Sequence, residues 1–179
     1  EINRTPPKTQ SALLEAMGEH HVTTAGKTYP LEEPFFVLAT QNTIELEGTY
    51  PLPEAQLDRF LMNIVMDYLP IADEERMVRQ TTAPEQPVLS PILNAEELLT
   101  VRKLVREVAV SGNVISYAVR LCASTRPGTG NASAKVNEMV KWGAGSRASQ
   151  ALIMAGKARA ILQGRRNVAC EDVRALMLP

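Results

Sequence analysis

Two apolar runs, at 35–39 and 60–66, constrain the fold of this chain more than any other feature. The first run is FFVLA, and the second, FLMNIVM, contains a single polar residue, Asn63. Runs of this length without polar alternation are typical of strands buried on both faces, as in a parallel sheet covered by helices. The sequence therefore predicts an α/β fold for this part of the chain, with a strand at each run.

Short polar side chains follow the first run directly, at Thr40, Gln41 and Asn42. In open α/β sheets, ligands bind beyond the carboxyl ends of the strands, so we expect a site at this position. A loop punctuated by glycine and proline is predicted at 47–53, and a short helix at 54–58 then leads to Arg59.

Helical signals dominate after Pro70. Asn94 and Glu97 form a capping-box pattern, and Ser111 is expected to cap the helix after that. We therefore predict a domain boundary near Pro70, which gives domains at 1–70 and 71–179, the second entirely α-helical. Helices are expected at about 5–18, at 73–80, from 94 onward, and at 111–126, 146–163 and 171–178. Thr5 is expected to cap the first of them with its hydroxyl group. The other expected elements are a hairpin at 22–31, an extended linker at 81–93 and a loop at 128–134.

Apolar residues at helical spacing predict which faces of these helices are buried. The members of these faces are Leu13, Leu14 and Met17 in the first helix, Leu98, Val101 and Val105 in the helix from 94, and Val114, Ala118, Leu121 and Cys122 in the helix from 111.

Composition excludes several classes of function. Of the 179 residues, 45% are hydrophobic and 22% charged, and the formal net charge is -1. This balance is typical of a globular protein and gives no electrostatic reason to expect nucleic acid or anionic lipid as a partner. No apolar run approaches the roughly 20 residues of a membrane span. The distant Cys122 and Cys170 favour two reduced thiols in a cytoplasmic protein, and the pair His20–His21 lacks a third ligand for a metal.

The residues that follow the first apolar run resemble a known family. LATQN at 38–42 and GTYPLPEAQLDRF at 48–60 resemble the MoxR branch of the AAA+ ATPases. EINR at 1–4 is similar to the end of that family's Walker B motif, and GAGSRA at 143–148 is similar to its sensor 2 motif. The resemblance implies a partial AAA+ (P-loop NTPase) nucleotide-binding core at 1–70, followed by an all-α lid domain at 71–179. It also implies ATP and Mg²⁺ as cofactors.

Two residues of the core match family positions that act on the attacking water. Glu1 matches the glutamate that polarises this water, since a carboxylate can accept its proton. Asn42 matches sensor 1, because an amide can contact the γ-phosphate and hold the water without titrating. For Asn42, capping of the strand end is the purely structural alternative.

Two arginines match positions that neutralise phosphate charge. Arg59 resembles the arginine finger, which reaches the site of a neighbouring subunit with a permanently charged, planar guanidinium. A surface ion pair with Asp58 or Glu54 is the alternative. Arg147 resembles sensor 2, in the first turn of a long helix, where a docked phosphate would offset the unfavourable helix dipole. Gly145-Ser146 stands where the family usually has Ser-Pro, which loses the proline but retains a hydroxyl expected to cap the helix.

Two family features are absent from the sequence. It contains no GxxxxGK[ST] pattern, and no Walker B aspartate precedes Glu1. In the family, the strand that carries the phosphate loop lies between the two strands predicted here. We therefore expect this chain to correspond to the C-terminal part of an ATPase, to be inactive alone and not to reach its native fold alone.

The resemblance implies an ATP-hydrolysing chaperone that works as a hexameric ring and remodels a protein client. Metal-binding proteins and von Willebrand A-type proteins are the clients it suggests. Two alternatives stay open: a non-catalytic interaction module, and a ring ATPase directed at nucleic acid through the hairpin at 22–31. Lys27 is the basic residue at the tip of that hairpin, which is thin support for a nucleic-acid partner.

Overall fold

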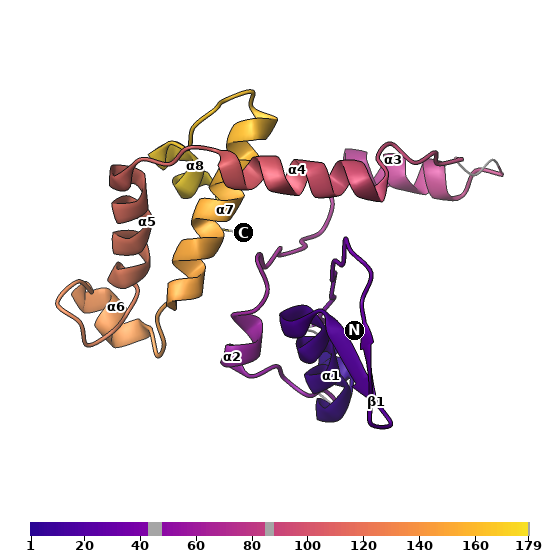
Figure 1. Ribbon diagram of the computed structural model, residues 1–179, viewed down its shortest axis with the longest axis horizontal. Coiled ribbons are helices and arrows are strands. Elements are labelled where there is room, and N and C mark those ends of the chain that lie inside the picture. Colours follow the sequence, from indigo (N-terminus) through magenta and orange to yellow (C-terminus); the bar gives the residue numbers. More distant parts are fainter. Residues whose placement is uncertain (43–47, 85–87, 179) are drawn as a thin grey trace.

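The computed structural model describes residues 1–42, 48–84 and 88–178. These residues form one antiparallel hairpin and a set of helices arranged in two groups (Figure 1). The elements are a 3₁₀ turn η1 (Ile2–Arg4), helix α1 (Pro7–Glu19), strands β1 (His21–Thr24) and β2 (Lys27–Pro30), and helices α2 (Glu54–Leu57), α3 (Ile71–Thr81), α4 (Ala95–Glu107), α5 (Gly112–Ser124), α6 (Ala134–Met139), α7 (Ser146–Leu162) and α8 (Cys170–Ala175).

Helix α1 begins with proline at its first position, which needs no intrahelical N–H partner there. The predicted hydroxyl cap at Thr5 is wrong, because Pro6 occupies the N-cap and Thr5 Oγ1 instead donates to the carbonyl of Ile2 at 2.7 Å. The helix ends at His20, which adopts a left-handed conformation with φ of 55°. Leu14 is buried as predicted, whereas Leu13 and Met17 of the expected face are only half-buried.

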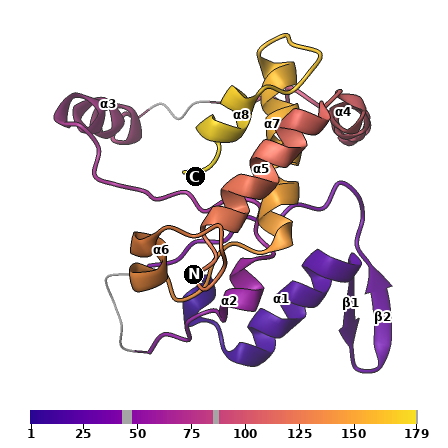
Figure 2. The ribbon, with the colours of Figure 1, turned by 90° about the vertical axis from the view of Figure 1, so that its left-hand side faces the viewer.

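The predicted hairpin is confirmed and follows α1 directly. β1 pairs antiparallel with β2, with His21 opposite Pro30 and Thr24 opposite Lys27. Ala25 and Gly26 make the turn with φ of 49° and 77°, as a two-residue hairpin loop requires. The hairpin packs along α1 (Figure 2).

The two strands predicted at 35–39 and 60–66 do not form in this structure. A strand needs a neighbouring strand with which to exchange backbone hydrogen bonds. Within the described residues, the backbone hydrogen bond nearest to the first run lies just after it, where Ile2 N donates to the Thr40 carbonyl at 2.9 Å. Leu38 and Met66 are therefore each 85% exposed. The predicted loop at 47–53 is present from Gly48 onward, and residue 47 lies outside the described residues.

Helix α7 is the centre of the helical group and contacts α4, α5 and α8 (Figures 1 and 2). Val114 and Ala118 of α5 pack there with Val168 and Val173 to form a buried cluster. The predicted capping box of Asn94 with Glu97 and the cap at Ser111 are both present. The predicted face of α5 is also confirmed, with Leu121 half-buried and the other three members buried.

Other details of the helical part differ from the prediction. Leu98 and Val101 of the expected α4 face are exposed, because α4 projects from the group and meets it mainly through α7 (Figure 1). Helix α6 was not predicted; Ser133 caps it at the end of the expected loop. Part of the linker predicted at 81–93 belongs to α3, and its residues 85–87 lie outside the described residues, as does Pro179. In the described ranges, no helix is long and apolar enough to cross a membrane.

Candidate active site

Backbone pairing brings Glu1 and Asn42 to neighbouring segments. Ile2, next to Glu1, donates its N–H to the carbonyl of Thr40 at 2.9 Å. Asn3 Nδ2 then donates to the carbonyl of Asn42 at 2.8 Å. The segment that begins at Glu1 is therefore paired with the segment that ends at Asn42.

Two buried amide side chains, which sequence reasoning missed, hold this end together. Gln10 Nε2 of α1 donates both to the Ile2 carbonyl at 3.0 Å and to the Tyr50 carbonyl at 2.9 Å. Tyr50 N in turn donates to the Asn3 carbonyl at 2.6 Å. Asn3 and Gln10 are 9% and 3% exposed. The signal that could have found Gln10 is its place four residues before the buried Leu14, on the inward face of α1.

The Glu1 carboxylate is partly exposed and forms an ion pair. Its Oε2 is 2.8 Å from Nε of Arg4, three residues along the 3₁₀ turn. Both side chains are partly open to solvent, so this ion pair contributes little to stability.

Arg59 lies just beyond α2, where the helix ends at Asp58. Its side chain is exposed and its Nη1 would be 3.0 Å from a Cβ atom placed on Gly18, at the end of α1. Within the described residues it forms no ion pair with Asp58 or Glu54, so the surface pair considered as its alternative role is not present.

Asp58 instead faces Arg147. Its Oδ2 lies 3.9 Å from Arg147 Nε, with both side chains about half exposed. This contact joins the turn after α2 to the first turn of α7, two regions far apart in the sequence. The structure therefore brings Arg147 to the segment of Arg59, and it pairs the segment of Glu1 with that of Asn42.

The turn before α7 is fixed by the end of α5. Ala144 N donates to Thr125 Oγ1 at 2.9 Å, and Arg126 Nε donates to the Ala144 carbonyl at 2.8 Å. A Cβ on Gly143 would lie 2.4 Å from the Cα of Arg126, so only glycine fits. The cap expected from Ser146 is wrong, since Gly145 is the N-cap and no side chain caps the helix.

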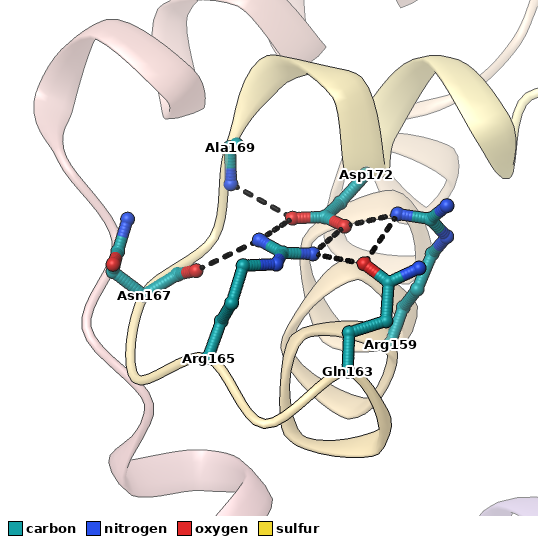
Figure 3. Close-up of polar contacts among 6 residues, drawn as sticks. All are labelled: Arg159, Gln163, Arg165, Asn167, Ala169 and Asp172. Carbon is teal, nitrogen blue, oxygen red and sulfur yellow. Dashed lines mark hydrogen bonds and ion pairs between the residues drawn. The ribbon is translucent and has the colours of Figure 1, made fainter.

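A second polar network surrounds the buried carboxylate of Asp172 in α8, beside the C-terminal end of α7 (Figure 3). Asp172 is fully buried and accepts hydrogen bonds from Arg165, from the Ala169 N–H and from Arg159. The hydrogen bonds from Arg165, followed by those from Ala169 and Arg159, outweigh burial and hold the pKa of Asp172 far below its usual range. Sequence reasoning missed this network, which fastens α8 to the end of α7.

Comparisons with known proteins agree with the resemblance seen in the sequence. A family model described as ATPase family associated with various cellular activities (AAA) matches residues 1–62, and an AAA lid domain model matches 132–179. The chain is 42% identical to "Chaperone MoxR1" of Mycobacterium tuberculosis, over 97% of this chain and 46% of that protein. It is 43% identical to the uncharacterised YeaC of Bacillus subtilis, over 98% of this chain and 52% of that one.

A solved structure has the same fold. It is a crystal structure of a Cytophaga hutchinsonii protein described as a candidate ATPase, with a TM-score of 0.90 and 39% identity. The match covers 98% of this chain and 53% of that one, so the chain spans about half the length of the proteins it matches. The expected fold class, an AAA+ fragment followed by a lid, is confirmed by these matches. The chain therefore belongs to the MoxR branch of the AAA+ ATPases.

Proposed function

We propose that this chain is part of a longer ATP-hydrolysing chaperone that forms hexameric rings and remodels a protein client. The observation that carries the proposal is the pairing of the Glu1 and Asn42 segments through Ile2–Thr40 and Asn3–Asn42. It supports ATP hydrolysis because a carboxylate and an amide then belong to two adjacent segments, from which we propose that they act on one water. We assign residues 1–70 to the nucleotide-binding core and 71–179 to the lid.

In this proposal each polar residue has one task. Glu1 accepts a proton from the attacking water at its carboxylate. Asn42 orients that water and donates to the γ-phosphate. Arg147, at the start of the 17-residue helix α7, contacts the phosphate from the lid. Arg59 reaches the nucleotide of the adjacent subunit.

Groups that can bind phosphate support the proposal of a nucleotide ligand. Two exposed arginines and an uncapped helix start are groups that bind phosphate oxygens. Bound ATP with Mg²⁺ would supply the γ-phosphoryl group, with the metal offsetting its charge. In the part of the chain that the structure describes, no group of three or more His, Cys, Asp or Glu could hold a metal, so we assign no metal ligand.

The client is proposed to be a protein that binds a metal or contains a von Willebrand A-type domain. The chaperone role is supported by the name of the Mycobacterium tuberculosis relative. This chain alone is proposed not to turn over ATP, because its sequence has no GxxxxGK[ST] loop to hold the phosphates.

Mixing two inactive variants of the longer chain tests the assignment. Arg59→Ala should lower ATP turnover on the order of a thousandfold while leaving ATP binding intact, because a finger acts across the interface. Glu1→Gln should also be inactive. Mixed rings contain interfaces where an intact Glu1 meets an intact Arg59, so part of the activity should return.

Arg76→Ala is the matched control, since Arg76 is an exposed arginine whose partner Asp73 lies 2.9 Å away on the same helix, α3. It should leave turnover unchanged. Co-assembled rings that regain no activity, or an Arg59→Ala variant with parental turnover, would contradict the assignment of Arg59.

A further inference from the structure

The carboxylate of Asp58 occupies the N-terminal end of α7. A Cβ on Gly145, the N-cap, would lie 3.6 Å and 3.8 Å from its two oxygens. The same carboxylate is 3.9 Å from Arg147 Nε. No side chain caps this helix, so Asp58 supplies negative charge both to the helix end and to the arginine.

A nucleotide phosphate would need the same two partners. Helix starts and guanidinium groups bind a phosphate for the reasons that they attract a carboxylate. Two anions cannot share one arginine at close range without repulsion. The Asp58–Arg147 contact is long and about half exposed, and such pairs contribute little stability. A phosphate can therefore displace Asp58 from Arg147.

We propose that Asp58 is a positioning residue that stands in for the phosphate, holding Arg147 at the start of α7 until ATP replaces it. The proposal rests on the proposed function, in which Arg147 binds the γ-phosphate. In this proposal the Asp58 carboxylate competes with ATP for Arg147, so removing the charge of Asp58 should strengthen ATP binding. A purely structural tie between α2 and α7 would have the opposite effect, because losing it would loosen the site.

The test measures Kd for a non-hydrolysable ATP analogue and for ADP in the longer chain. Asp58→Asn keeps the shape of the side chain and removes its charge, and it should bind the analogue about two- to fivefold more tightly, as expected for release of a surface pair. ADP, which lacks the γ-phosphate, should bind with parental Kd. Asp58→Glu retains the charge and should behave as the parent does. Asp73→Asn, which removes a carboxylate from the exposed pair with Arg76, is the control and should change neither Kd.

A double-variant cycle separates this proposal from the proposed function. In an Arg147→Ala background, Asp58→Asn should no longer alter Kd. If Arg147→Ala itself leaves ATP affinity and turnover at parental values, the role of Arg147 fails and the proposal fails with it. If Arg147→Ala slows turnover, but Asp58→Asn weakens binding, tightens analogue and ADP equally, or does not fold, the role of Asp58 alone is overturned.

Discussion

The side-chain amide of Asn3 forms two hydrogen bonds with the backbone of Asn42. Nδ2 donates to the Asn42 carbonyl at 2.8 Å, and Oδ1 accepts from the Asn42 N–H at 3.4 Å. An amide is required for this, because only an amide offers a donor and an acceptor side by side. Asn3 thereby makes the two hydrogen bonds that a residue of a neighbouring strand would make. These bonds hold the backbone of Asn42, from which its side chain extends.

Asn3→Ala should therefore reduce both stability and ATP turnover in the longer chain. The loss leaves the Asn42 backbone without these partners, which costs about 1–3 kcal/mol of unfolding free energy. Turnover should fall by at least about tenfold, because small displacements of a group that holds the attacking water are costly. Chemical denaturation and steady-state hydrolysis measure the two effects.

Asn94→Ala is the control for this prediction. Asn94 is also an asparagine, and its side chain caps α4, away from the candidate active site. Its replacement by alanine should cost about 1 kcal/mol of unfolding free energy and leave turnover unchanged. Equal loss of turnover in the two variants would mean that Asn3 acts only through stability.

Asp172 should make stability depend on acid pH. Its pKa is lower in the folded state than the value of about 3.9 in an unfolded chain. Its contribution is then complete above about pH 4 and is lost as the pH falls from there toward the folded-state pKa. Urea denaturation of the longer chain between pH 2 and 7 should show this loss in the parent.

Asp172→Asn should remove that part of the pH dependence and lower the unfolding free energy at pH 7 by about 2–3 kcal/mol. Asp73→Asn removes an exposed carboxylate instead and should cost less than about 1 kcal/mol. A parental acid profile in Asp172→Asn would show that other carboxylates cause the loss.

Gly143→Ala should displace the turn that carries Arg147. The added methyl group would meet backbone atoms, 2.4 Å from the Arg126 Cα and 2.5 Å from the Thr125 carbonyl oxygen, which cannot rotate away. We expect a loss of about 1–3 kcal/mol or more, measured by denaturation. Gly130→Ala has open space around its Cβ and should cost little, so similar losses in both would refute the steric argument.

The helices were predictable because their signals are local. Asn94 with Glu97 and Ser111 mark helix starts within four residues of sequence, and the structure has both. Helix α6 was not predicted because its N-cap, Ser133, ends a stretch of small residues that is typical of a loop. The hairpin was predictable for the same reason as the helices, since its turn and both strands are adjacent.

The strands and the contacts of the site depend on partners that are distant in the sequence. Local sequence patterns do not identify such partners. The runs at 35–39 and 60–66 have the composition of buried strands, but composition does not supply a partner strand. Likewise, nothing local to Asp58 indicates that it faces Arg147, and nothing local to Asn3 indicates Asn42. The residue types of the site were recognisable, whereas the side chains that position them required the fold.

The exposed run at 60–66 has a consequence for the behaviour of the chain in solution. Ile64, Val65 and Met66 are largely open to solvent, and exposed apolar residues with high strand propensity are prone to pair between copies of a chain. Charges stand at both borders, Arg59 and Asp67, where gatekeeper residues discourage such stacking. Self-association should therefore begin at this run, and it should become stronger with salt as those two charges are screened.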